Sequence, residues 1–304
     1  MPSAAIFQLP AALALASSAE PVTLENPPAC VADARAAALE RDDGPPDPTV
    51  YRTLRTRLAA ARAKMPPLYR RAASDPFSKV LDELGASGFA EVLADDRERV
   101  GAARLMLDLA QAILQNGEGY RERATDGFQE VVSDLYDGFL SAEDRRGVKP
   151  PDKGAVPPLV KWGSADDGPY TWPVTATASF EVTAPIVSLP AANAKGGLLA
   201  WSALAHETVG HDVLAADEGL HDELAKALRE KLVAAKLGLA LADYWADRLD
   251  ETASDVLGVL NMGPAAAVGL IGYFRALNGA HAGKAVLRNV GREDDPHPAD
   301  VARG

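Results

Sequence analysis

Apolar residues at helical spacing dominate the first half of the chain. Between residues 49 and 146 they recur every three or four positions, in runs that begin near Val50, Val100 and Phe128. Such a period is typical of amphipathic helices that pack against one another. The pattern predicts an all-helical N-terminal half over residues 49–146, preceded by a proline-rich arm and lead-in over residues 1–48.

The second half begins with extended structure. Residues 147–176 combine proline and glycine with several aromatic side chains, which is typical of an ordered loop lying against the body of a protein. β-Branched residues then predict a strand over residues 177–189. Pro185 places part of this strand at the edge of a sheet, because proline donates no backbone hydrogen bond.

Helical patterns return in the last third of the chain. We expect helices over Gly197–Ala216, His221–Leu237, Leu239–Leu260 and Pro264–Leu277. The predicted fold class is therefore mainly α with a small β element. Residues 147–285 form the second half and residues 286–304 a C-terminal tail, and we expect the two halves to share one body.

The charge and cysteine content of the 304 residues narrows the function. Lys and Arg number 31 against 43 Asp and Glu, which gives a net charge of −12. A field of that sign repels phosphate backbones, so nucleic-acid binding is not expected. The single cysteine, Cys30, excludes an intrachain disulfide and a cysteine-rich metal site, and we expect it to be a buried free thiol. Histidines and carboxylates must therefore hold any metal.

The chain has no stretch of roughly 18 consecutive apolar residues, so no transmembrane segment is expected. Its first 19 residues are apolar and end in small side chains, as a signal peptide does. However, no Lys or Arg precedes Arg35, and Gln8 and Pro10 interrupt the apolar run. A cytoplasmic location is favoured, and the weak signal-peptide-like pattern leaves export open.

The residues that carry chemistry lie in the middle of an Ala/Leu-rich helix. His206 and His211 flank Glu207 in the pattern His-Glu-x-x-Gly-His. Two metal-binding histidines, with a glutamate as general base toward the attacking water, are typical of zinc hydrolases. Two of only five histidines fall within these six residues, which makes a chance pattern improbable.

The spacing of this motif makes a structural prediction. Positions five apart lie roughly 140° apart around a regular helix, so two such histidines do not meet one ion. The helix must be widened locally, as in a π-bulge, and such bulges favour functional sites. Gly210 is the position where glycine's backbone freedom makes widening easiest.

A catalytic zinc usually has three protein ligands, so a third is required. Glu251 and Asp255 lie four residues apart, and therefore on one face, of the predicted helix over residues 239–260. Glu251 suits the third ligand, and Asp255 suits a carboxylate that holds a metal-binding histidine by its other nitrogen. Charges on these otherwise apolar helices need compensation, which a divalent cation would provide.

His206-Glu207-x-x-Gly210-His211, followed by Asp250-Glu251-Thr252-Ala253-Ser254-Asp255, resembles the gluzincin class of metallopeptidases. Within that class, the extra residue and the glycine are similar to the dipeptidyl peptidase III family. The resemblance covers residues 197–255 and does not extend to exopeptidase specificity, and aspartates stand at 250 and 255 where that family more often has glutamate.

The resemblance implies a zincin-like helical metallohydrolase core with one zinc per chain. Its ligands would be His206, His211 and Glu251, Glu207 would be the general base, and Asp255 would orient a ligand histidine. Peptides or other small amides are the implied substrates.

Two alternatives stay open. First, His206 and His211 could be satisfied core histidines, with the downstream carboxylates paired to Arg248 or Lys236. Second, the chain could be a non-catalytic helical protein, binding a metal or a partner through a structural or vestigial zinc site. A fourth protein ligand such as His221 or His281 would favour this second reading. For His221, His281, Tyr244 and Tyr273 we favour capping or ordinary packing, and the oligomeric state is open.

Overall fold

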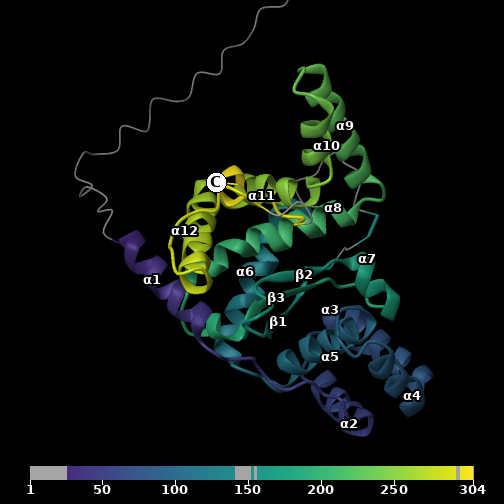
Figure 1. Ribbon diagram of the computed structural model, residues 1–304. Helices are drawn as coiled ribbons and strands as arrows, with labels where there is room; N and C mark the ends of the chain where they lie inside the picture. The colour runs from purple at the N-terminus through teal and green to yellow at the C-terminus, as the bar shows by residue number, and fades with distance from the viewer. Residues whose placement is uncertain (1–25, 141–151, 154–155, 292–294, 304) are drawn as a thin grey trace, which may run out of the picture.

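The computed structural model describes residues 26–140, 152–153, 156–291 and 295–303 (Figure 1). Side chains of residues 139, 140 and 213 are outside this description. The described chain is mainly helical with one small sheet, which confirms the predicted fold class. The proposed signal-like segment, Met1 to Ala19, lies outside the described residues.

Helices fill most of the first half, as predicted. They are α1 (Asn26–Leu39), α2 (Tyr51–Arg62), α3 (Pro67–Tyr69), α4 (Asp75–Asp95), α5 (Ala102–Glu118) and α6 (Glu122–Leu140), with a π-helical turn at Arg70–Ser74. Cys30 lies on α1 and is exposed, so the expectation of a buried thiol was wrong. Only Ala34 and Ala37 of α1 are buried, which leaves the remaining α1 side chains at or near the surface.

The second half contains the sheet and the remaining helices. Its strands are β1 (Leu159–Gly163), β2 (Tyr170–Trp172) and β3 (Ile186–Pro190). Its helices are α7 (Val174–Thr177), α8 (Asp212–Ala216), α9 (Leu220–Ala234), α10 (Leu239–Ala246), α11 (Leu249–Met262), α12 (Pro264–His281) and α13 (Asp300–Arg303). Short 3₁₀ segments span Ala178–Phe180, Ala191–Ala194 and Leu198–Ser202, and a π-helix spans Ala205–His211.

The predicted strand over residues 177–189 was too long and wrongly placed in the sheet. Its first residues form the end of α7 and a 3₁₀ turn, and only Ile186–Pro190 is extended. This strand, β3, is central, pairing parallel with β1 and antiparallel with β2. Pro185 precedes the ladder, and its carbonyl accepts a hydrogen bond from Leu159 at 2.8 Å. A proline outside the paired residues does not prevent a central position.

The predicted long helix over residues 239–260 is two helices. α10 ends at Ala246 and α11 begins at Leu249, because Arg248 leaves the helical region with φ −112° and ψ 21°. The guanidinium of Arg248 lies 4.1 Å from the ring centre of Tyr244, so Tyr244 has a packing role as favoured. The predicted helix over residues 197–216 is likewise divided into 3₁₀, π and α segments. α12 continues to His281, which therefore ends a helix and does not lie in a loop.

The small sheet joins two hydrophobic clusters. In one, Leu159 of β1 and Ile186 of β3 pack with the side chains of α2, α4 and α5. In the other, Trp162 of β1 packs with Phe128 of α6 and with Val209 of the π-helix. Side chains alternate between the two faces of a strand, so one strand supplies both clusters. Both clusters contain residues from both predicted halves.

Figure 1 shows α1 lying along α12, and the α9–α10 hairpin projecting from the body. In the part of the chain that the structure describes, no helix has the length and apolar character needed to cross a membrane.

We predict that Gly117→Ala destabilises the helical N-terminal half. An added Cβ at Gly117 in α5 would lie 2.5 Å from Ala61 Cβ and 2.6 Å from the Ala61 carbonyl oxygen of α2. Overpacking of this kind costs about 1–3 kcal/mol. Gly127→Ala, where a Cβ meets nothing within 4 Å, is the matched control and should be neutral or stabilising. Urea unfolding followed by circular dichroism measures both, and equal midpoints would contradict the close α2–α5 contact.

Candidate metal centre

The motif segment forms a π-helix over Ala205–His211, as its spacing predicted. The reason for glycine at position 210 differs from the expected one, because Gly210 is absent from the positive-φ residues of the described chain. Instead, α11 lies directly against it. A Cβ at Gly210 would stand 2.2 Å from Ser254 Cβ and 2.4 Å from Ser254 Cα. Glycine is thus required by the close approach of the two helices that carry the candidate ligands.

This approach brings together the three residues predicted as metal ligands. One ligand atom each from His206, His211 and Glu251 lies within 4.8 Å of the others. Donor atoms bound to one tetrahedral ion at about 2.1 Å lie roughly 3.4 Å apart, so a small contraction would complete such a site. His206 and Glu251 are buried and His211 is half-buried. The cluster can therefore hold a metal ion.

Aspartates hold both histidines by their Nδ1 atoms. Asp255 Oδ1 is 2.8 Å from His206 Nδ1, and Asp250 Oδ2 is 3.1 Å from His211 Nδ1. When Nδ1–H donates to a carboxylate, the Nε2 lone pair is free for a metal. The sequence singled out Asp255 for this contact with a ligand histidine, and the structure adds Asp250 as the partner of the second one.

The third ligand, Glu251, has an unsatisfied atom that tests whether a cation fits. Its Oε2 is buried and makes no hydrogen bond, although His206 Nε2 lies 3.2 Å away. The Nε2 of His211 lies 4.0 Å from Glu251 Oε1. Imidazole nitrogens and a carboxylate that face one another without a hydrogen bond match the donor set of a bound cation.

The electrostatics of the cluster favour a positive charge among its carboxylates. Burial by itself lowers the pKa of His206, but its hydrogen bond to Asp255 and the nearby carboxylates of Glu251 and Glu207 outweigh burial and raise the pKa to about 10. Burial raises the pKa of the Glu251 carboxyl, yet the neighbouring histidines bring it below its ordinary value. The carboxylates thus favour a cation, either a proton on His206 or a metal ion, and metal binding would release that proton.

Glu207, the predicted general base, is buried beside the ligand group. Its Oε2 lies 2.9 Å from Thr171 Oγ1 of β2, and 4.0 Å from His211 Nε2. Tyr273 of α12 is also buried, and burial together with the charge of Glu207 raises the pKa of its hydroxyl. Tyr273 therefore stays protonated and able to donate.

Two cavities meet at this cluster, and both are lined by His206, Glu207 and His297. The β2-side cavity, of about 670 Å³, adds residues of β2, α8 and α11, and also His221. The α12-side cavity, of about 380 Å³, adds mainly residues of α12, including His281. Of these two histidines, His221 is half-exposed and lies 3.2 Å from Asp222 on its own helix, which fits the capping or surface role favoured for it.

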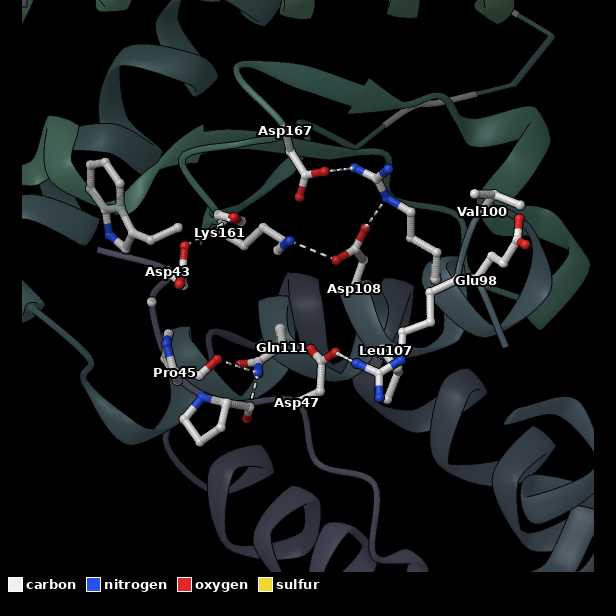
Figure 2. Close-up of a pocket in the computed structure, with 17 residues that line it drawn as sticks. Asp43, Pro45, Asp47, Glu98, Val100, Leu107, Asp108, Gln111, Lys161 and Asp167 are labelled. Atoms are coloured by element: carbon white, nitrogen blue, oxygen red, sulfur yellow. Dashed lines mark hydrogen bonds and ion pairs between the residues drawn. The ribbon is translucent and has the colours of Figure 1, made fainter. Parts of the chain in front are cut away.

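A third cavity, of about 550 Å³, lies next to the β2-side cavity (Figure 2). The ion pair of Arg104 and Asp167 lines both cavities. Inside the third cavity, the buried ammonium of Lys161 lies 2.6 Å from Asp108 and 2.7 Å from the Tyr170 hydroxyl. Burial lowers the pKa of Lys161, but Tyr170 and Asp108 outweigh burial and raise it. This pairing anchors β2, which carries the residue that contacts Glu207.

Besides Thr171 and the role of Asp250, sequence reasoning missed two site residues that lie in the predicted C-terminal tail. His297 Nε2 lies 3.3 Å from Glu251 Oε2, and its Nδ1 lies 3.0 Å from Asp295 Oδ1. Arg303 donates from Nε to Asp255 Oδ2 at 2.7 Å. The one available signal was the neighbouring Asp295-Pro-His297 triplet, in which a carboxylate precedes one of the few histidines.

No family model, curated protein or solved structure matches the chain.

We predict that the chain binds one divalent transition-metal ion. Bound metal is first removed with a chelator and dialysis, and the metal is then added back. His206→Ala should abolish stoichiometric binding, because it removes a ligand and leaves Asp255 without its imidazole partner. His221→Ala is the matched control, since this half-exposed histidine pairs with Asp222 and lies outside the ligand group. Elemental analysis and calorimetric titration provide the readout. Equal binding by the two variants would contradict the assignment.

We also predict that Gly210→Ala disrupts the centre while Gly127→Ala does not. The added methyl group must displace the backbone of α11 at Ser254, which carries Glu251 with it. Overpacking costs about 1–3 kcal/mol of stability, and metal affinity should fall as well. Chemical denaturation with and without metal measures both effects, and wild-type affinity in Gly210→Ala would show that the helix contact does not set the ligand geometry.

Proposed function

We propose that this chain is a zinc-dependent hydrolase with a zincin-like helical core, and most specifically a metallopeptidase. One observation carries the proposal: Glu207 is buried on the same π-helix as His206 and His211, next to the ligand group and at the junction of two cavities. A ligand cluster alone would serve a structural metal. A carboxylate beside the ligands, open to cavities, suits a hydrolytic site.

Zinc fits the donor set better than calcium or magnesium does. Two imidazoles and one carboxylate are a known ligand combination for catalytic zinc, whereas calcium and magnesium prefer sites built from oxygen alone. When bound, zinc would polarise the scissile carbonyl and lower the pKa of water. Asp255 and Asp250 would fix the two imidazoles in the tautomer that leaves Nε2 free.

The residues of the chain supply the remaining chemistry. Glu207 would accept a proton from the attacking water and pass it to the leaving amine, as a general base and then a general acid. Thr171 Oγ1 lies 2.9 Å from Glu207 Oε2, where its hydroxyl can donate and help to orient the carboxylate. The protonated Tyr273 hydroxyl and the His297 ring line the α12-side cavity and are two donors that could stabilise developing negative charge on the substrate.

The α12-side cavity favours an uncharged side chain next to the scissile bond. Its apolar wall comes from Leu270, Phe274 and Leu277. The two arginines that also line it are paired within the protein, Arg288 with Asp300 and Arg303 with Asp255. We therefore propose peptides, or similar small amides, with an aliphatic or aromatic residue at this position.

One contact favours the second function, a non-catalytic protein with a structural zinc site. His297 Nε2 lies 3.3 Å from Glu251 Oε2, where a fourth protein ligand would close the coordination sphere. His297 is not part of the mutually close ligand group, however, and its side chain is 44% exposed. An open coordination position is therefore the better-supported arrangement.

We predict that Glu207→Gln keeps zinc and loses turnover. The amide preserves the shape of the side chain but accepts no proton, and loss of general acid–base catalysis costs about 10²–10⁴-fold in rate. Cleavage of a mixed peptide library, followed by mass spectrometry, measures turnover and reports the side-chain preference. Glu130→Gln, an exposed position on α6, is the control. A zinc-loaded wild-type protein that cleaves nothing in the library would favour the structural-zinc function.

A further inference from the structure

Residues 295–303 lie against the candidate metal centre, and a buried carboxylate holds them there. Asp300, at the start of α13, is 2% exposed. Its Oδ1 accepts hydrogen bonds from Arg288 Nε at 2.9 Å and Nη2 at 2.8 Å, and its Oδ2 accepts one from Asn278 Nδ2 at 2.7 Å. These bonds tie α13 to α12 and to the segment that follows it, and so they place Arg303.

Arg303 reaches Asp255 with both arms of its guanidinium. Nε donates to Oδ2 at 2.7 Å and Nη2 donates to Oδ1 at 2.9 Å. The side chain is only 8% exposed, and its guanidinium lies 4.9 Å from the ring centre of Phe274. A planar fork on a carboxylate fixes the orientation of both partners, which a single point charge does not.

The same carboxylate holds His206. Asp255 Oδ1 accepts from Arg303 and also lies 2.8 Å from His206 Nδ1, so guanidinium, carboxylate and imidazole form one chain of contacts leading to the ligand group. We infer that Arg303 is a positioning residue: it fixes Asp255 so that Asp255 holds the His206 ring with Nε2 directed at the metal. The inference rests on the proposed metal centre, and it concerns a residue outside the ligand group.

Arg303 also contributes to the charge balance of the site. Glu207, Glu251 and Asp255 are all buried within the site. Buried carboxylates are costly unless they are paired with cations. One divalent ion does not neutralise three of them, and Arg303 supplies the remaining positive charge.

The test measures zinc affinity by competition with a chromophoric chelator, which requires no hydrolytic activity. Arg303→Met retains much of the side-chain bulk but loses the charge and the fork, and we expect affinity to fall by about 10–100-fold, as for loss of other residues that orient ligands. Arg303→Lys retains the charge alone and should restore part of the loss. Arg275→Met, an exposed arginine on α12, is the matched control and should bind zinc like the wild type.

A double-mutant cycle separates positioning from a general structural role. If Arg303 acts through Asp255, then Arg303→Met should cost little affinity once Asp255→Asn is present, because the two losses share one path. The cobalt(II)-loaded Arg303→Met protein should also show a shifted ligand-field absorption spectrum. Thermal unfolding followed by circular dichroism identifies variants that fail to fold.

The outcomes distinguish this inference from the proposed function. If the wild-type chain does not bind zinc, then both the proposed metal centre and this inference are wrong. A wild-type chain that binds zinc, with Arg303→Met binding equally well, would overturn the inference and leave the proposed function standing. If the fold-losses in zinc affinity of Arg303→Met and Asp255→Asn multiply in the double mutant, the inference is also overturned, because Arg303 then acts independently of Asp255.

Discussion

The contact between Gly210 and Ser254 is the constraint on which the rest of the site depends. The π-helix that carries two histidines and α11, which carries Glu251, meet at a distance where no side chain fits on position 210. Widening of the helix turns two histidines five residues apart toward the same point, and the close approach brings the carboxylate to them. Without both features, the three ligand atoms would not converge.

The ligand residues are largely buried, so they can lie this close together only if the charges of the carboxylates are balanced. The site gathers carboxylates in an interior where each one is stable only with a cationic or hydrogen-bonding partner. The aspartates and Glu207 have such partners. Asp255 and Asp250 contact the Nδ1 atoms of the two histidines, Glu207 contacts the Thr171 hydroxyl, and Asp255 also accepts hydrogen bonds from Arg303. Glu251 Oε2 is left without a hydrogen bond, at the position where a metal ion would complete the arrangement.

The sequence predicted those parts of the site that depend on local spacing. The histidines, the π-helix, Glu251 and Asp255 follow from helical geometry within two short segments, because neighbours on a helix are fixed by residue number. His297 and Arg303 do not follow from spacing, because they reach the site only through the tertiary contacts of Asp300 with α12 and Arg288. The strand was misplaced for a related reason: β-branched composition does not determine which residues pair in a sheet.

X-ray absorption at the zinc edge reports directly on whether His206, His211 and Glu251 bind one zinc ion. We expect one zinc per chain, with two imidazole nitrogens and one carboxylate oxygen among its nearest ligands at about 2.0–2.2 Å, and one imidazole fewer in His211→Ala. A third imidazole in the wild-type spectrum would identify a site closed by His297 and contradict an open catalytic centre. A spectrum without imidazole ligands would contradict the metal centre itself.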